Sequence, residues 1–177
     1  MLTIRTVNFL RDWRKIKKLY VAAFPADERK PLWLIRQKYR TKEADIWVIE
    51  TGKDFVGFAT TQNQFDMIML DYFAISEEKR NQGYGGKALH LFQETYKDKR
   101  FFLEIECEDE TAPNAYERTK RKQFYLSNQM TEIGVKAKVF GVDMELLGFE
   151  CAVTFKEYKN LYYASYGDRI IPNIIEL

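Results

Sequence analysis

Three glycines fall within four positions of the segment KRNQGYGGKALHLF (79–92), at Gly83, Gly85 and Gly86. A strand-like run ends shortly before them, and a helical pattern follows directly. In a strand–turn–helix arrangement, free backbone N–H groups and the helix dipole favour a negative charge. Glycine also permits the backbone angles of such a turn and lets a ligand approach closely. These residues predict a phosphate or pyrophosphate site, with a plain connecting turn as the alternative.

Two other phosphate-binding patterns fit less well. Ala88 stands where a P-loop needs Ser or Thr, and the glycine spacing is wrong for that loop. The dinucleotide pattern G-x-G-x-x-G/A is met, and Glu106 ends the next strand about 20 residues on. However, the polar run 76–82 separates the strand from the first glycine, and no further βαβ units follow. A nicotinamide-dinucleotide-binding oxidoreductase is therefore the weaker alternative.

Composition and charge bound the class of protein. The 177 residues are 46% hydrophobic, and 28 basic residues nearly balance 26 acidic ones. This balance predicts a globular chain without the basic face of a nucleic-acid-binding protein. No apolar run is long enough to cross a membrane, and early charges are unlike a signal peptide. Two distant cysteines and the single His90 give no metal-site spacing. We expect a cytoplasmic protein without a metal.

The elements that position the glycine turn follow from periodicity and turn signals. The sequence predicts one domain over 1–177 with a mixed α/β (α+β) fold. Capping boxes are expected at Asn114–Glu117 and Thr154–Glu157, Asn8 is a plausible N-cap, and a turn is expected at Thr51–Asp54. The tail 168–177 is expected to pack on a partner or on its own sheet. Strands are expected at 2–7, three times within 44–75, and at 100–107, 131–140 and 142–153, and helices at 8–24, 31–41, after the glycines through Tyr96, 114–130 and 155–166.

The segment RNQGYGGKAL (80–89) resembles the acyl-CoA-binding signature of the GNAT superfamily of N-acetyltransferases, Q/R-x-x-G-x-G/A. Arg80, Gly83 and Gly85 match the signature position by position. The order of strands and helices across nearly the whole chain is also similar to that family. The resemblance implies a central, mixed but mostly antiparallel sheet flanked by helices. It further implies two strands that splay apart around an acyl-CoA site.

The resemblance implies acetyl-CoA as co-substrate and assigns residues to it. The pyrophosphate would rest on backbone N–H groups between Asn81 and Gly86, with Arg80 beside them. The pantetheine arm would pair with the main chain near Phe73, Ala74 and Ile75. The complete set implied for the cofactor is Phe73, Ala74, Ile75, Arg80, Asn81, Gln82, Gly83, Tyr84, Gly85, Gly86, Lys87 and Asn114.

The chemistry implied by the resemblance is transfer of acetyl to a primary amine by direct attack. Tyr125 matches the family's general acid, although Gln129 and Met130 stand where the family often has glycine and an aromatic. Strand alternation puts Glu104 and Glu106 on one face, which makes them candidate bases. Solvated or salt-bridged glutamates are the alternative, and Asp71 is a weaker third candidate.

The acceptor would be a small-molecule amine or a peptide amine, and the loop after the first helix would contact it. Phe24, Glu28 and Arg29 are the candidate substrate-binding residues, with an ordinary polar loop as the alternative. A non-catalytic acyl-CoA-binding regulatory module is the second function to weigh. We read His90 as a structural or surface residue, so a nucleophilic Cys107 has no evident histidine partner. The aromatic content leaves enough apolar surface for a homodimer.

Overall fold

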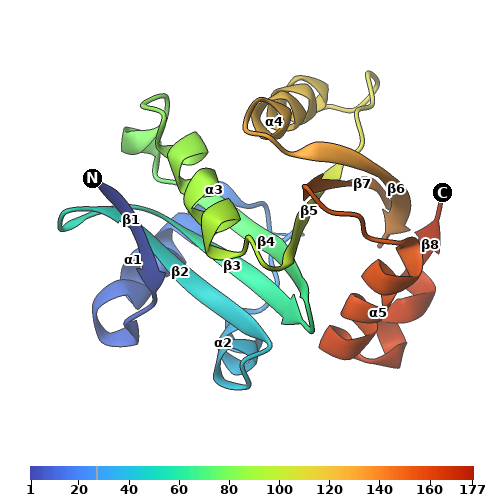
Figure 1. Cartoon of the computed structure of the whole chain (residues 1–177), viewed down its shortest axis with the longest axis horizontal. Coiled ribbons are helices and arrows are strands. Elements are labelled where there is room, and N and C mark those ends of the chain that lie inside the picture. Colours follow the sequence, from blue (N-terminus) through green and yellow to red (C-terminus); the bar gives the residue numbers. More distant parts are fainter. Residues whose placement is uncertain (27) are drawn as a thin grey trace. The chain divides into compact units, whose positions relative to one another are not determined.

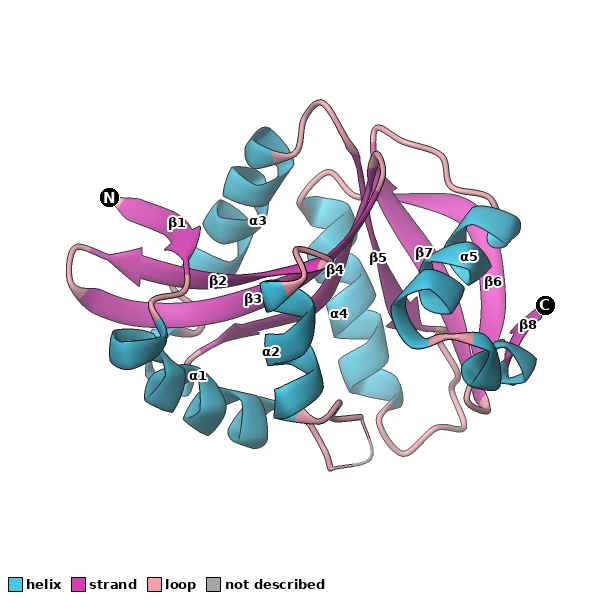
Figure 2. Ribbon diagram, turned by 90° about the horizontal axis from the view of Figure 1, so that it is seen from below, coloured by secondary structure: helices cyan, strands magenta, loops and turns pink. Residues whose placement is uncertain are grey.

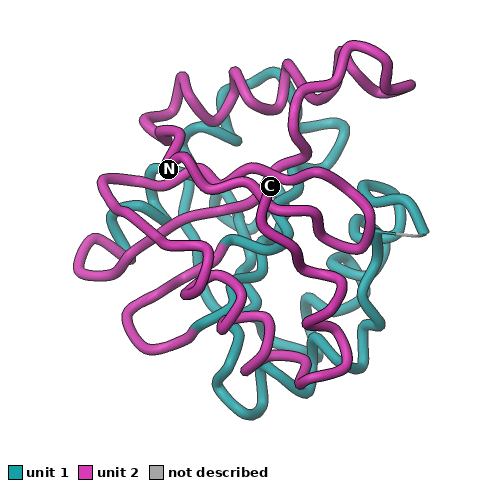
Figure 3. The backbone as a smooth tube through the Cα atoms, turned by 90° about the vertical axis from the view of Figure 1, so that its right-hand side faces the viewer, with its two compact units in different colours: residues 1–63, 70–95 teal, residues 64–69, 96–177 magenta. Residues whose placement is uncertain are grey.

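The computed structural model describes residues 1–26 and 28–177. The chain forms two compact units, Met1–Asn63 with Leu70–Thr95 and Gln64–Met69 with Tyr96–Leu177 (Figure 3). Figure 1 shows the course of the chain through its helices and strands. None of the helices in the two described ranges is both long and apolar enough to cross a bilayer.

Unit 1 holds β1, β2, nearly all of β3 and the part of β4 from Leu70 onward, and these strands are neighbours in that order. The β1–β2 and β2–β3 pairs are antiparallel, the second as the predicted hairpin turn at Thr51–Asp54 requires. Gly52, at φ +62°, forms the predicted turn between β2 and β3. The bounds are β1 Leu2–Thr6, β2 Ala44–Thr51, β3 Asp54–Gln64 and β4 Met67–Ile75.

Three helices cover these strands, α1 and α2 on one face and α3 on the other (Figure 2). The predicted N-cap is confirmed, because the Asn8 side chain accepts from the amides of Leu10 and Arg11. The apolar stripe of α1 packs with α2 and strands β2–β4 into a core that contains Ile16, Tyr20 and Tyr72. The bounds are α1 Phe9–Ala23, α2 Leu32–Arg40 and α3 Tyr84–Thr95.

Unit 2 holds the strands β5, β7, β6 and β8 in that order, with all three pairs antiparallel. The tail adds β8 to β6, so it packs on its own sheet. Helices α4 and α5 lie on opposite sides of the strands (Figures 1 and 2). The capping box of Thr154 and Glu157 at the start of α5 is confirmed. The bounds are β5 Arg100–Glu106, α4 Ala115–Ser127, β6 Thr131–Val139, β7 Val142–Phe149, α5 Phe155–Tyr166 and β8 Ile174–Glu176.

Helix α4 departs from expectation at both ends. The predicted capping box is wrong, because the Asn114 side chain makes no capping hydrogen bond to the helix. Its amide instead donates to Glu106 and its oxygen accepts from Arg118. The helix ends at Ser127, and Gln129 then takes a left-handed conformation at φ +69°. The exit thus has the backbone angle that glycine usually supplies, without a glycine.

Candidate functional site

The glycine turn lies between β4 and α3 in unit 1. A short 3₁₀ helix, Glu77–Lys79, follows β4, and α3 begins at Tyr84. Asn81 (φ +59°) and Gly83 (φ +74°) are both left-handed. Such angles turn backbone N–H groups toward an anion, and the first N–H groups of a helix have no partner within it. A Cβ added at Gly83 would meet no atom within 4 Å. Glycine is therefore favoured here by the left-handed backbone angle and not by a lack of space for a side chain.

Side chains around the turn are tied to its backbone. Arg80 Nε donates to the carbonyl of Ile75 over 3.1 Å, which holds the guanidinium at the end of β4. Gln82 Nε2 donates to the carbonyl of Glu78 over 2.9 Å. Asn81, Gln82, Gly83 and Lys87 are exposed, whereas Tyr84, Gly85 and Gly86 are half-buried. The backbone of the turn therefore remains open to solvent.

The end of β4 brings the predicted arm-binding residues to the edge of the turn. Ala74 is buried, and Phe73 and Ile75 are half-buried. The Phe73 ring lies 6.3 Å from the ring of Phe92 on α3. The backbone here is tightly packed, because a Cβ at Gly57 would lie 2.3 Å from the carbonyl oxygen of Ala74. Strand β4 is therefore firmly placed just before the turn.

Tyr125 lies near the end of α4 in unit 2 and is 9% exposed. Its ring packs edge-on against Phe124 with 5.1 Å between centroids. Burial raises the pKa of Tyr125 to about 12, while the positive charge of Arg121 acts in the opposite direction. Across residues 1–26 and 28–177, no hydrogen bond to the Tyr125 hydroxyl is found. The hydroxyl is therefore protonated at neutral pH, and its proton is not committed elsewhere in the described chain.

Glu104 and Glu106, both on β5, have different hydrogen-bond partners. Glu104 accepts hydrogen bonds from the hydroxyls of Tyr158 and Tyr162 on α5, the second over 2.6 Å. Glu106 pairs with Arg118 over 2.9 Å and Arg121 over 3.0 Å. Asn114 donates to Glu106 as well. Two tyrosine hydroxyls thus bind Glu104, whereas two guanidinium groups and one amide bind Glu106.

The predicted acceptor residues lie in the segment between α1 and α2. The Phe24 ring packs against Tyr20 and Tyr72 at centroid distances of 5.6 and 4.9 Å. The Glu28 side chain is exposed, and Arg29 is half-buried. The weaker candidate base, Asp71, pairs with Lys30 over 2.6 Å. This ion pair escaped sequence reasoning, since nothing in the sequence brings positions 30 and 71 together.

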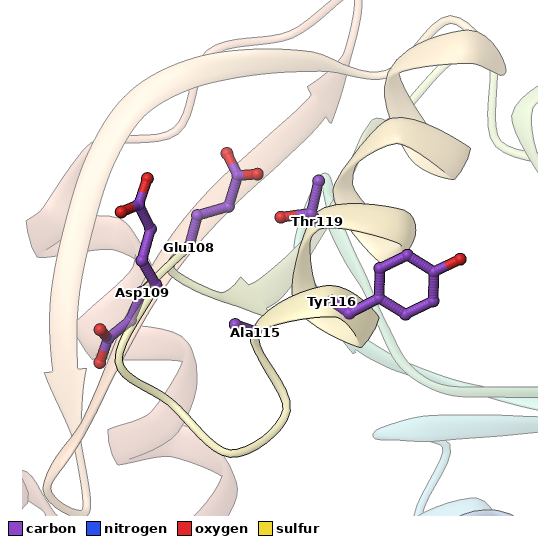
Figure 4. A pocket seen from close by; sticks show the side chains of 6 residues that line it. Glu108, Asp109, Ala115, Tyr116 and Thr119 are labelled. Carbon is purple, nitrogen blue, oxygen red and sulfur yellow. The ribbon is translucent and has the colours of Figure 1, made fainter.

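A second feature that sequence reasoning missed is an open pocket of about 520 Å³ in unit 2 (Figure 4). The carboxylates line one side and the start of α4 the other. Its negative charge makes it unsuited to a phosphate. The run Glu108–Glu110 was the available signal. The lining residues are Glu108, Asp109, Glu110, Ala115, Tyr116 and Thr119.

Two further side chains singled out in the sequence are His90 and Cys107. His90 is exposed on α3. Burial raises the pKa of the Cys107 thiol, and the nearby carboxylate of Glu145 acts in the same direction. A raised thiol pKa lowers the thiolate fraction and so disfavours a nucleophilic role for Cys107.

Comparison with known proteins defines the class. Residues 13–120, more than half of the chain, match the model of the acetyltransferase (GNAT) family. The chain therefore belongs to this family, is an acetyltransferase, and has the mixed, mostly antiparallel fold expected from the glycine signature. This result goes against the dinucleotide-binding alternative. No curated protein matches the sequence significantly.

Solved structures share the fold at low sequence identity. A protein from Bacteroides thetaiotaomicron assigned to the GNAT family has 21% identity and a TM-score of 0.76, over 94% of this chain and 99% of its own. A GNAT acetyltransferase from Elizabethkingia anophelis with acetyl-CoA bound has 18% identity and a TM-score of 0.61, over 85% and 98%. The ribosomal-protein-S18-alanine N-acetyltransferase from Escherichia coli has 17% identity and a TM-score of 0.57, over 87% and 96%.

Proposed function

We propose that the protein moves acetyl from acetyl-CoA to a primary amine by direct attack, with no covalent enzyme intermediate. The observation that carries this proposal is the open turn with left-handed residues at Asn81 and Gly83, directly before α3, in a member of the GNAT family. An open row of backbone N–H groups at a helix start suits a pyrophosphate. The similar protein from Elizabethkingia anophelis binds acetyl-CoA, which agrees with this assignment.

The residues present fit the donor. Asn81–Gly86 supply backbone N–H groups, Arg80 adds a positive charge, and Phe73–Ile75 lie immediately before the turn. Lys87 is exposed on the first turn of α3, where it can approach the phosphates. Asn114 fits less well, because its side chain is already bonded to Glu106 and Arg118. We therefore propose that the residues predicted from the sequence bind acetyl-CoA, and that Asn114 is the least suited of them.

Tyr125 is proposed as the general acid. The reaction forms a C–N bond and breaks a C–S bond, so the sulfur needs a proton and the amine must lose one. The buried Tyr125 hydroxyl keeps its proton at neutral pH, so it can donate a hydrogen bond or a proton to the sulfur as negative charge develops there. Main-chain donors near Phe73–Ile75 would stabilise the oxyanion that builds on the carbonyl.

Glu104 is the better candidate for the base. Both oxygens of Glu106 are engaged by guanidinium groups, so a proton from the amine would have to displace an ion pair. Glu104 accepts from the hydroxyl groups of Tyr158 and Tyr162, which can reorient and pass a proton on. We propose that Glu104 accepts the amine proton, directly or through a water, and that Glu106 is structural.

The acceptor is proposed to be a small-molecule or peptide amine, bound against Phe24, Glu28 and Arg29. The exposed Glu28 carboxylate suits a cationic amine. The similar enzyme from Escherichia coli is named for an alanine of a ribosomal protein, which supports a peptide amine as one choice. Spermidine, an aminoglycoside and an alanine-initial peptide therefore make a suitable panel.

Calorimetric titration with acetyl-CoA, with NAD as a parallel control, tests donor binding. Release of free thiol with each amine of the panel then tests turnover. We expect saturable binding of acetyl-CoA, none of NAD, and turnover of at least one amine. Binding without any turnover would favour the regulatory module, and failure to bind acetyl-CoA would overturn the proposal.

Three further expectations remain predictions. They are a single domain over 1–177, a cytoplasmic location and a homodimer. Size-exclusion chromatography with light scattering measures the last of these directly.

A further inference from the structure

The segment between α1 and α2 is tied to the rest of unit 1 by two buried tyrosines. Tyr72 on β4 donates to the carbonyl of Glu28 over 2.8 Å and accepts from the amide of Lys30 over 2.9 Å. Tyr20 on α1 donates to the carbonyl of Lys30 over 2.9 Å. Burial raises the pKa of both tyrosines, which keeps the hydroxyls protonated and able to donate. The backbone at 28–30 is therefore held by side chains and not by a strand or helix.

An ion pair completes this anchor. Lys30 Nζ lies 2.6 Å from Asp71 Oδ1, with the two side chains 25% and 9% exposed. The ammonium also lies 5.6 Å from the centre of the Tyr72 ring. Partial burial makes such a pair stronger than an exposed one, because water and salt screen it less. Lys30 is thus bound through its amide, its carbonyl and its side chain.

The position of Asp71 and Tyr72 on β4 links this anchor to the chemistry. They directly precede Phe73–Ile75, which the proposed function assigns to the acetyl donor. The anchored segment carries Glu28 and Arg29, which the proposed function assigns to the acceptor. One strand thus carries the donor contacts and the anchor of the acceptor segment in consecutive residues.

We propose that Lys30, through its ion pair with Asp71 and its backbone bonds to Tyr72 and Tyr20, is a positioning residue that sets the acceptor segment on β4. Asp71 is then an anchor and not the base. The consequence is specific: loss of the pair disturbs the acceptor site and leaves the donor site and the proton transfers intact. This inference rests on the proposed function, since it assumes that the segment contacts the acceptor.

Steady-state kinetics with the best amine of the panel provides the first test. Lys30→Met and Asp71→Asn should each raise the KM for the amine by roughly fivefold, with kcat and acetyl-CoA affinity unchanged within about twofold. The double variant should be no worse than either single variant, because both remove the same contact. Lys30→Arg should restore most of the loss, since it keeps the charge.

The matched control is Lys138→Met, which removes an ion pair of the same length, 2.6 Å, between Lys138 on β6 and Asp143 on β7. It should change neither KM nor kcat. An unchanged amine KM in Lys30→Met would overturn the inference. So would a fall in kcat without a change of KM in Asp71→Asn, because that result would make Asp71 the base.

Hydrogen–deuterium exchange separates this inference from the proposed function. Exchange at the backbone amide of residue 30, which donates to Tyr72, should be faster in Lys30→Met and in Asp71→Asn than in the wild type or in Lys138→Met. If the wild type binds acetyl-CoA but acetylates no amine, the proposed function fails and exchange alone decides. Faster exchange would then support positioning of the segment by Lys30, and unchanged exchange would overturn it.

Discussion

The glycine turn of unit 1 and the β5–α4 region of unit 2 are built on different principles. The turn offers main-chain groups, and its geometry depends on left-handed angles at Asn81 and Gly83. The β5–α4 region offers side chains, a buried tyrosine hydroxyl and two carboxylates with opposite surroundings. We infer that the first region binds the donor and the second moves protons. Substitutions in the two regions should therefore change different kinetic constants.

The largest effect is expected at Tyr125. Tyr125→Phe keeps the ring and removes the proton, so kcat should fall by about 100-fold, as is typical for loss of a general acid. The affinity for acetyl-CoA should stay the same. Calorimetry measures the affinity, and steady-state kinetics measures kcat. A loss of affinity with kcat retained would contradict the assignment of donor binding to the glycine turn and proton transfer to the β5–α4 region.

The same tyrosine predicts a pH dependence. Burial raises its pKa from 10.0 to about 12, so the hydroxyl stays protonated in a range where an exposed tyrosine ionises. The kcat profile should therefore show no alkaline fall near pH 10 from this group. The unfolded chain binds fewer protons than the folded chain between these two values, so stability should fall as pH rises through this window. Denaturant unfolding of wild type and Tyr125→Phe across that range measures the contribution.

The second effect is expected at Gly83. Gly83→Asp combines a strained left-handed angle with a negative charge, and should weaken acetyl-CoA binding by roughly 30-fold. The matched control is Gly83→Asn, which has the same shape, no charge and a residue type that tolerates this angle. Gly83→Asn should weaken acetyl-CoA binding by only about threefold, because asparagine tolerates the left-handed angle. Equal losses in both variants would show that the angle alone, and not the charge, governs this site.

The third effect separates the two glutamates of β5. Glu104→Gln should lower kcat by about tenfold if Glu104 is the base. Glu106→Gln should leave kcat within about twofold and lower the free energy of unfolding by about 1–2 kcal/mol, because it breaks ion pairs with Arg118 and Arg121 that are partly buried. The reverse pattern, with the kinetic loss at Glu106, would exchange the two roles.

The smallest effect tests the assumption that a left-handed backbone angle favours glycine. Gln129 and Gly83 share a left-handed angle, φ +69° and +74°, but only one of them is glycine. Gln129→Gly should therefore raise the free energy of unfolding by roughly 0.5 kcal/mol. This value is the backbone strain that glycine relieves minus the extra conformational entropy that glycine loses on folding. Gln123→Gly, at a position that is also exposed but lies inside α4, should lower the free energy of unfolding by about 1 kcal/mol. A destabilising Gln129→Gly would weaken the argument for glycine at position 83.

Features that depend on neighbouring residues were predictable from the sequence. The Asn8 cap, the turn at Gly52 and the Thr154 capping box are confirmed, because the partners lie within four residues. Apolar periodicity likewise placed the strands and helices, with errors of a few residues at their ends. The family signature at 80–85 then gave the class of the protein.

Choices of partner between distant residues were not predictable. Asn114 has the right type and spacing for a capping box, but Glu106 and Arg118 take its side chain. Lys30 and Asp71 are separated by 41 residues in the sequence. Glu104 is separated from its partners Tyr158 and Tyr162 by 54 and 58 residues. Such pairs form only after packing brings the elements together, so no local pattern records them.

The main-chain construction of the glycine turn has an evolutionary consequence. Every residue except proline has a backbone N–H group, so most substitutions within 81–87 leave the hydrogen-bond donors in place. The left-handed angles at positions 81 and 83 are the main backbone constraint on the choice of residue. Side chains elsewhere are then free to diverge toward new acceptors while the acetyl donor is retained.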